Sequence, residues 1–172
     1  MTFLAPKRYV ASVDRIDLEE LYLAGKRALL VDRDNTLVPR DAVRAPLAVR
    51  DWLARANDLG FRICLVSNNW YRDQVETSAR ELGIDHVIWC AMKPAPFALW
   101  AGLRKLSASR EESILVGDQL YTDVLASRLA GIDSVLVKPQ THVDMWYTHV
   151  FRFFERRALR DIPCDEGGEG SR

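Results

Sequence analysis

The sequence contains few cysteines and histidines, no long apolar run, and no excess of charge of either sign. Its cysteines, Cys64, Cys90 and Cys164, form no CxxC pair, which argues against a secreted disulfide scaffold and predicts a reducing compartment. The histidines and cysteines share no familiar zinc spacing, so we expect oxygen ligands for any metal. The 24 Lys and Arg residues balance 24 Asp and Glu residues, which excludes a protein that binds nucleic acid over its whole surface.

The apolar runs fall far short of the ~20 residues that span a bilayer, and no signal-type apolar core begins the chain. We therefore expect a cytoplasmic protein with no nucleic acid partner and no obligate protein partner. The 172 residues, 48% of them hydrophobic, suffice for one domain that buries its own core. We expect that domain at 1–160, with an N-terminal lead at 1–25, a core at 26–140 and a terminal helix at 141–160. A disordered polar tail is expected at 161–172.

Apolar and amphipathic segments alternate along the chain, which is typical of parallel strands joined by crossover helices. Strands are predicted at 28–32, 61–66, 86–89, 113–116 and 134–137. Helices are predicted at 17–24, 47–59, 71–82, from Pro94 to about 106, and at 121–130. The pattern therefore predicts a single doubly wound α/β fold, with a parallel five-stranded sheet flanked by helices and no cap domain.

Chemically reactive residues follow the predicted strands. They are Asp32, Asp34 and Thr36 after the first, Ser67, Asn68 and Asn69 after the second, Lys93 after the third, and Asp118 and Asp123 after the fourth. Ligands bind beyond the carboxyl ends of the strands in open parallel sheets, so we expect these side chains to share one crevice.

The residue types in this crevice suit a metal ion and a phosphate together. Asp32, Asp34 and Asp118 would form the hard oxygen cage that Mg²⁺ prefers. Lys93 and the Ser67 hydroxyl would bind phosphate oxygens. One carboxylate can then attack the phosphate and form an aspartyl-phosphate, while a second protonates the leaving oxygen and later activates water.

The same residues resemble the four motifs of the haloacid dehalogenase (HAD) phosphatase superfamily, in the order that this family uses. DRDNT at 32–36 looks like motif I, Ser67 like motif II, Lys93 before Pro94 like motif III, and GDQLYTD at 117–123 like motif IV. Asn35 stands where the family usually has glycine, and asparagine tolerates unusual backbone angles better than most residues.

The resemblance implies a role for each matching residue. Asp32 would be the nucleophile and a Mg²⁺ ligand, and Asp34 the general acid and base. Asp34 would also bind the metal through its main-chain carbonyl, as would Asp118 through its carboxylate. Asp123 would bind the metal through water or orient its ligands.

The remaining motif residues would bind the substrate. The resemblance implies that Ser67 and the Asn68 amide hold the phosphate, together with Thr36. Lys93 would neutralise charge between the nucleophile and the phosphate. Arg33 and Arg40 are candidates for contact with a second anionic group, although exposed arginines usually have no specific role.

The spacing of the motifs leaves no room for the cap domain found in many relatives. The chain therefore resembles the capless subclass IIIA phosphatases, and the DxDNTL, SNN and GDQxxTD motifs look most like the YqeG-type branch. Members of that branch are associated with dephosphorylating phosphatidylglycerophosphate. The alternatives are a phosphatase of a soluble sugar phosphate, nucleotide or phosphorylated macromolecule, a receiver-like phospho-aspartate switch, and a scaffold that has lost activity.

The predicted helix at 141–160 combines aromatic and basic residues. Such a helix can pack its rings on the edge of the sheet, and we favour that interpretation. The alternative is a peripheral contact with an anionic membrane, which would place the protein at the membrane surface and suit a phospholipid headgroup as its substrate.

Overall fold

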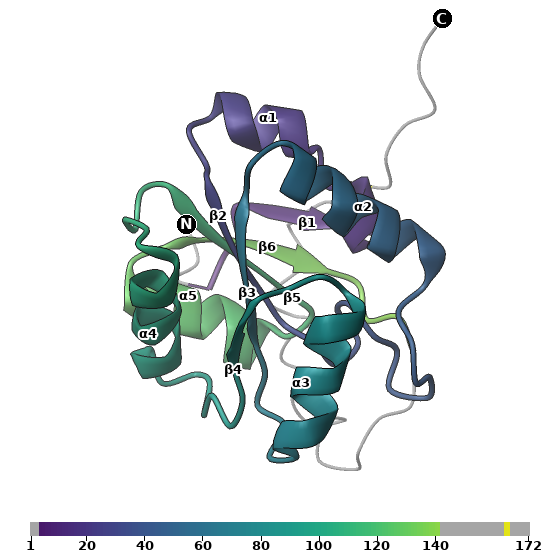
Figure 1. The fold of residues 1–172 in the computed structure, drawn as a ribbon. Helices are drawn as coiled ribbons and strands as arrows, with labels where there is room; N and C mark the ends of the chain where they lie inside the picture. The colour runs from purple at the N-terminus through teal and green to yellow at the C-terminus, as the bar shows by residue number, and fades with distance from the viewer. Residues whose placement is uncertain (1–3, 142–163, 166–172) are drawn as a thin grey trace, which may run out of the picture.

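The computed structural model describes residues 4–141 and 164–165 (Figure 1). All six strands pair in parallel, in the order β1-β6-β5-β2-β3-β4. The strands are β1 (Arg8–Val10), β2 (Ala28–Val31), β3 (Arg62–Val66), β4 (His86–Ile88), β5 (Ser113–Gly117) and β6 (Asp133–Val137). The helices are α1 (Leu18–Leu23), α2 (Leu47–Asp58), α3 (Arg72–Glu81), α4 (Phe97–Leu106) and α5 (Leu125–Ala130). Short helical turns η1 (Val13–Arg15) and η2 (Leu120–Val124) complete the described elements.

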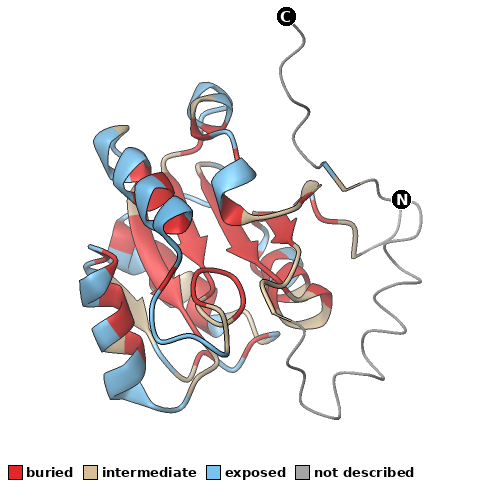
Figure 2. Cartoon of the chain, turned by 90° about the vertical axis from the view of Figure 1, so that its right-hand side faces the viewer, coloured by how far each residue is buried: buried red, intermediate tan, exposed pale blue. Residues whose placement is uncertain are grey.

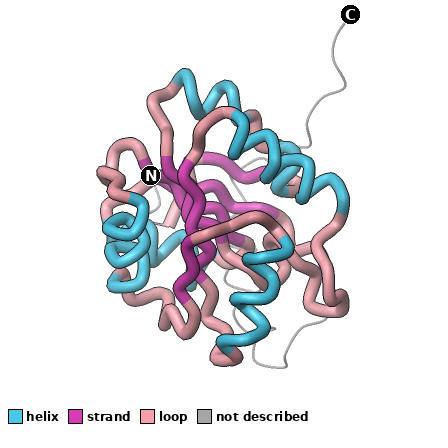
Figure 3. Tube along the Cα trace, viewed as in Figure 1, coloured by secondary structure: helices cyan, strands magenta, loops and turns pink. Residues whose placement is uncertain are grey.

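Helices cover both faces of the sheet, as Figure 3 shows, and alternate side chains of each strand contact opposite layers. On one face, Leu29 and Val31 of β2 belong to a cluster that includes residues of α1, α2 and α3. On the other face, Leu30 of β2 and Cys64 of β3 pack with residues of α4 and α5. Figure 2 shows the strands as the buried centre of the molecule. The prediction of a doubly wound parallel α/β fold is therefore confirmed.

The prediction of five strands is wrong, because β1 adds a sixth at the edge of the sheet beside β6. This strand has three residues within the segment predicted as an N-terminal lead. The three residues are Arg, Tyr and Val, and only Val10 is buried. The segment therefore has no apolar run from which a strand could be predicted. Its place in the sheet depends on pairing with β6, which is distant in sequence.

Two helices differ from their predicted limits. The helix predicted from Pro94 begins at Phe97, because a proline disfavours helical backbone at the residue before it and Pro96 follows Ala95. The helix predicted from Tyr121 starts as the π-helical turn η2, which leads into α5. Both changes occur next to predicted site residues.

The terminal predictions fall largely outside the described residues. The helix predicted at 141–160 is described only at Thr141, and the tail at 161–172 only at Cys164 and Asp165. Asp165 bridges the outer edge of β1, where its N–H donates to the Tyr9 oxygen at 2.8 Å. Within the described ranges, no helix has both the length and the apolar composition needed to cross a bilayer.

Candidate active site

The central strands end side by side, and predicted site residues follow each of them. Asp32 follows β2, Ser67 follows β3, and Asp118 follows β5. Because β2 lies between β3 and β5, their carboxyl ends meet at one edge of the sheet. Lys93 comes from the segment after β4, and Asp123 lies in η2. The fold thus brings together residues that are far apart in the sequence.

Lys93 is buried and links two carboxylates. Its Nζ donates hydrogen bonds of 2.6 Å to Asp32 Oδ1 and Asp123 Oδ1, and one of 3.0 Å to the Val66 oxygen. Burial acts to lower the pKa of Lys93, but the charges of Asp123 and Asp32 outweigh it and raise the pKa above its usual value. The Asn68 side chain donates to the Lys93 carbonyl at 3.0 Å and accepts from its N–H at 2.8 Å. Asn68 therefore positions Lys93, and its contact with phosphate stays a prediction.

Three buried carboxylates surround this lysine. Asp32, Asp118 and Asp123 each place one oxygen so that all three oxygens lie within 4.8 Å of one another. Burial raises the pKa of Asp32 to about 6, although Lys93 acts in the opposite direction. Burial also raises the pKa of Asp118 well above its usual value, and the charge of Asp32 adds to that rise.

The charge balance of this cluster fits a divalent metal ion. Among the described residues, only Lys93 forms salt bridges with these acids, so negative charge is in excess. A hard cation with oxygen ligands, such as Mg²⁺, would relieve that excess. The observed donor set therefore suits the predicted cofactor.

Asp34 lies outside this carboxylate cluster. Arg33 Nη1 donates to Asp34 Oδ1 at 2.5 Å, and the Ser67 hydroxyl donates to Oδ2 at 3.4 Å. The Asp34 side chain is 25% exposed, whereas that of Asp32 is 9% exposed. The two acids of motif I thus occupy different environments, which suits separate chemical roles. A metal contact through the Asp34 main-chain carbonyl stays a prediction.

The two hydroxyls predicted to bind phosphate are fully buried. Ser67 Oγ accepts a hydrogen bond of 3.0 Å from the Asn69 N–H. Thr36 Oγ1 lies 3.3 Å from Asp32 Oδ2 and 3.5 Å from Asp118 Oδ1. Both hydroxyls therefore contact site carboxylates, and their binding of a substrate phosphate stays a prediction.

Asn35 has the left-handed backbone that its place in motif I suggested, with φ of 62°. Its side-chain oxygen accepts hydrogen bonds from the Thr141 hydroxyl at 2.8 Å and from the Arg40 N–H at 3.1 Å. Gln140 N–H donates to the Asn35 carbonyl at 3.2 Å, and its side chain donates to the Thr36 carbonyl. Neither Gln140 nor Thr141 was predicted as a site residue, although both follow the last strand at the same edge of the sheet.

A groove of about 1120 Å³ leads away from Asp34. Its walls are the loop at 39–43 and one face of α3 along most of its length, with the residues just before that helix. Between β2 and α2 the chain forms only this loop region, and α3 is the only described element between β3 and β4. Neither place where relatives carry a cap contains an inserted domain, so the groove opens to solvent.

Comparison with known proteins shows that the chain is similar in sequence to phosphatases. A family described as HAD-hydrolase-like matches residues 90–146. The chain is 32% identical over 157 residues to the probable phosphatase YqeG of Bacillus subtilis, covering 91% of this chain and 90% of that protein. A shorter segment of 45 residues is 47% identical to the ribonucleotide monophosphatase NagD of Escherichia coli K12, covering 26% of this chain and 18% of that protein.

Solved structures show the same fold at low sequence identity. NagD from E. coli K-12 aligns with a TM-score of 0.55 and 15% identity, over 82% of this chain and 94% of that chain. The 3-deoxy-D-manno-octulosonate 8-phosphate phosphatase of Moraxella catarrhalis aligns with a TM-score of 0.50 and 17% identity, over 72% of this chain and 84% of that one. These structures share the parallel α/β fold. The family match together with the relative that spans most of the chain shows that the chain belongs to the HAD superfamily. Within that superfamily, the chain belongs to the YqeG-type phosphatases.

Proposed function

We propose that this protein is a Mg²⁺-dependent phosphomonoester hydrolase that works through an aspartyl-phosphate on Asp32. The arrangement around Lys93 carries this proposal. Lys93 links Asp32 to Asp123, Asp118 lies alongside, and Asp34 is exposed to the groove. A buried carboxylate next to a cation, with a second acid two residues away, suits nucleophilic phosphoryl transfer.

The metal would be held by Asp32 and Asp118, with Asp123 contributing directly or through water and Asp34 through its main-chain carbonyl. When bound, Mg²⁺ neutralises charge on the phosphate oxygens and lets a negatively charged nucleophile approach them. Lys93 adds a positive charge from the protein side. The buried hydroxyl of Thr36 orients the Asp32 carboxylate through its contact with Oδ2.

In the first step an Asp32 oxygen attacks the phosphorus, and the bond from phosphorus to the leaving oxygen breaks. Asp34 gives its proton to that leaving oxygen, so an alcohol departs. Arg33 and Ser67 hold the two Asp34 oxygens and fix the direction of this transfer. In the second step Asp34 takes a proton from water, and the water oxygen attacks the aspartyl-phosphate. Inorganic phosphate leaves, and the Asp32 carboxylate and the protonated Asp34 are restored.

We propose phosphatidylglycerophosphate as the substrate. Membership of the YqeG-type branch supports this choice, because the motifs of the chain resemble those of proteins associated with that reaction. The groove supports it too, since its open side would admit a phosphate presented at a lipid surface. The short match to a ribonucleotide monophosphatase favours a soluble phosphomonoester as the second candidate.

The test is a phosphate-release panel with and without Mg²⁺. It compares phosphatidylglycerophosphate in vesicles with sugar phosphates and ribonucleoside monophosphates. We expect release that requires Mg²⁺ and is greatest on the lipid, and we expect Asp32→Asn to abolish it. Activity on soluble esters alone would refute the lipid substrate, and phosphate release by Asp32→Asn would refute the nucleophile.

A second variant separates a hydrolase from a receiver-like switch. Asp34→Asn removes the acid and base, so we expect turnover to slow and a phosphorylated enzyme to accumulate on substrates with good leaving groups. Intact-mass measurement after rapid quenching detects the added phosphoryl group. Full turnover by Asp34→Asn would contradict the mechanism.

A further inference from the structure

The groove contains two arginines that are bonded very differently. The Arg33 guanidinium already has partners within the protein, because Nη1 pairs with Asp34 and Nε donates to Ser78 Oγ at 2.9 Å. Its side chain is only 12% exposed. Arg40 also lines the groove, from the loop at 39–43.

Arg40 is a half-buried residue, and its guanidinium has no hydrogen bond or salt bridge with any described residue. Its main chain is nevertheless fixed, because the Arg40 N–H donates to Asn35 Oδ1 at 3.1 Å. Asn35 is itself bonded to Thr141 and Gln140. The loop thus anchors Arg40 next to motif I, while the guanidinium pairs with no residue that the structure describes.

The other charged groups along the groove do not supply a partner for Arg40. Asp73 and Glu81 are exposed residues of α3 that also line the groove. The Glu81 carboxylate lies 3.9 Å from Arg44, which is an exposed residue just after the loop. Arg40 lines the same groove as Asp34, the proposed acid and base of the reaction. A partly buried cation that pairs with no described residue favours binding of an anion.

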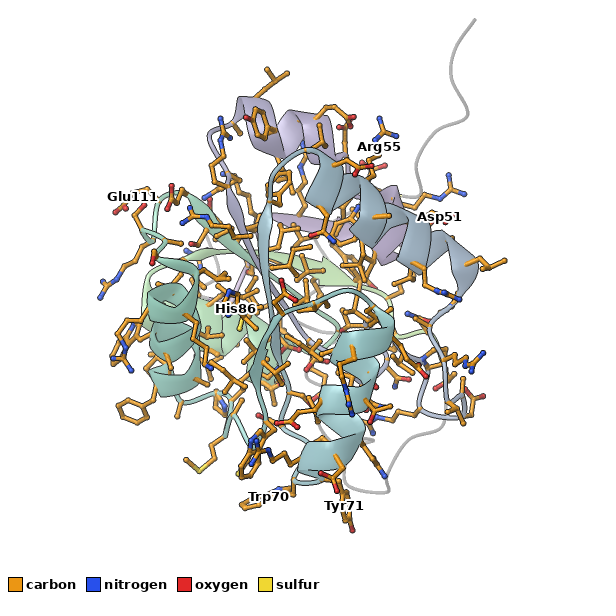
Figure 4. All side chains as sticks on the ribbon, viewed as in Figure 1. Asp51, Arg55, Trp70, Tyr71, His86 and Glu111 are labelled. Atoms are coloured by element: carbon orange, nitrogen blue, oxygen red, sulfur yellow. The ribbon has the colours of Figure 1, made fainter. Side chains whose placement is uncertain are left out.

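The role of Asp34 indicates which part of the substrate would carry an anion that binds Arg40. Asp34 protonates the leaving oxygen, so the leaving group extends from Asp34 into the groove. Figure 4 shows Trp70 and Tyr71 at the edge of the molecule where α3 begins, with their rings directed outward. Both line the groove and are 72% and 71% exposed, and Val43 on the facing loop is 84% exposed. The groove therefore offers a cation near the reacting atoms and apolar side chains at its rim.

We infer that Arg40 binds a second anionic group carried by the leaving group of the substrate, so that the enzyme selects phosphomonoesters with two anions. This inference rests on the proposed hydrolase function. A lipid headgroup with a phosphodiester next to its phosphomonoester has this chemistry, and so does a soluble bisphosphate. Arg40 thus determines specificity and takes no part in bond breaking.

The experiment compares matched substrates with the full chain and Mg²⁺. Propyl phosphate has one anionic group, and propane-1,3-diol bisphosphate adds a second. Glycerophosphoglycerol phosphate represents the lipid headgroup without its acyl chains, and phosphatidylglycerophosphate vesicles represent the lipid itself. The variants are Arg40→Gln, Arg40→Lys and the control Arg44→Gln, which removes an equal charge outside the groove.

We expect Arg40→Gln to lower kcat/KM about tenfold or more on the substrates with two anions, mainly through KM, because it removes a charge-assisted contact. Its kcat/KM on propyl phosphate should change less than about twofold, and Arg40→Lys should restore part of the loss. Arg44→Gln should behave as the wild type. Thermal melting of each variant reports whether it is folded.

An equal loss on propyl phosphate and the bisphosphate would overturn the inference, and so would unchanged kinetics for Arg40→Gln. A loss confined to vesicles would also overturn it, because Arg40 would then act on the lipid surface and not on the leaving group. The wild-type preference between the bisphosphate and the deacylated headgroup identifies the source of the second anion. If the wild type releases no phosphate from any of these substrates, the proposed function itself fails.

Discussion

Gly117, the last residue of β5, allows the backbone to approach the side chain of Asp123. A Cβ atom built on Gly117 would lie 2.4 Å from Asp123 Cγ and 2.6 Å from its Oδ2. Asp123 cannot easily move away, because it is buried and accepts hydrogen bonds from Lys93 Nζ and from the Gln119 N–H at 3.1 Å. The glycine in motif IV is therefore a steric requirement of the site.

We predict that Gly117→Ala lowers kcat/KM about a hundredfold, because displacing Asp123 also displaces the Lys93 ammonium by part of an ångström. Steady-state phosphate release measures the effect. Gly60→Ala is the matched control, since Gly60 has a φ of 84° with nothing within 4 Å of a built Cβ. That control should lose about 1–2 kcal/mol of stability from its left-handed backbone and keep its activity. Normal activity of Gly117→Ala would show that the motif tolerates the added methyl group.

At the scale of elements, α4 packs unusually close to the sheet at Gly102. A Cβ there would lie 2.4 Å from Leu30 Cδ2, 3.6 Å from Cys64 Sγ and 3.7 Å from Ile88 Cδ1. These atoms belong to β2, β3 and β4, the strands that support the site. The small residue thus sets how near α4 approaches the sheet.

Gly102→Ala should destabilise the protein by about 1–3 kcal/mol through overpacking. In an exposed helix the same change would raise the free energy of unfolding by about 1 kcal/mol. The sign of the change therefore distinguishes overpacking from helix propensity. Urea unfolding monitored by circular dichroism measures it. Ala101→Gly, at the neighbouring position of the same helix, should cost about 1 kcal/mol from helix propensity alone. A stabilised Gly102→Ala variant would mean that α4 can move outward without loss of packing.

For the whole molecule, the buried acids make stability depend on pH and on the metal. The pKa of Asp32 is raised to about 6 and that of Asp118 is also raised, both chiefly by burial. The metal-free folded protein therefore retains protons that the unfolded chain releases at lower pH. The stability that these two protonated carboxyls contribute to the folded state is complete below the usual pKa of an aspartate. It is lost as the pH rises through about 6, because the buried groups must then ionise.

We predict that the increase in Tm caused by Mg²⁺, relative to EDTA, is small at about pH 5 and grows by several degrees at about pH 7.5. The reason is that the cation must displace protons at low pH but relieves charge repulsion at higher pH. Differential scanning fluorimetry across this range measures the difference. In Asp118→Asn the neutral amide removes one raised pKa and one ligand, so its melting should respond weakly to Mg²⁺ at every pH. A wild-type response that is independent of pH would contradict the assigned metal ligands.

The sequence by itself determined the parallel α/β architecture and the grouping of the site residues. Apolar runs such as Ala28–Val31 identify strands buried on both faces, and a parallel sheet places their carboxyl ends together. Asp32, Lys93, Asp118 and Asp123 do meet in the structure because this rule depends only on local pattern and strand direction. Positive φ at Asn35 likewise follows from a local preference.

The tertiary structure alone decided the features that depend on pairing between distant segments. The short strand at Arg8–Val10 exists because β6 offers an open edge. The Asn68 side chain forms its hydrogen bonds with the Lys93 main chain. Gln140 and Thr141, which follow the last strand, form hydrogen bonds with motif I. Arg40 and Arg33 look alike in the sequence, but in the structure Arg33 pairs with Asp34, whereas the Arg40 guanidinium pairs with none of the described residues. Local sequence patterns determine where strands and turns form. The partners of each side chain depend instead on which distant segments the folded sheet brings into contact.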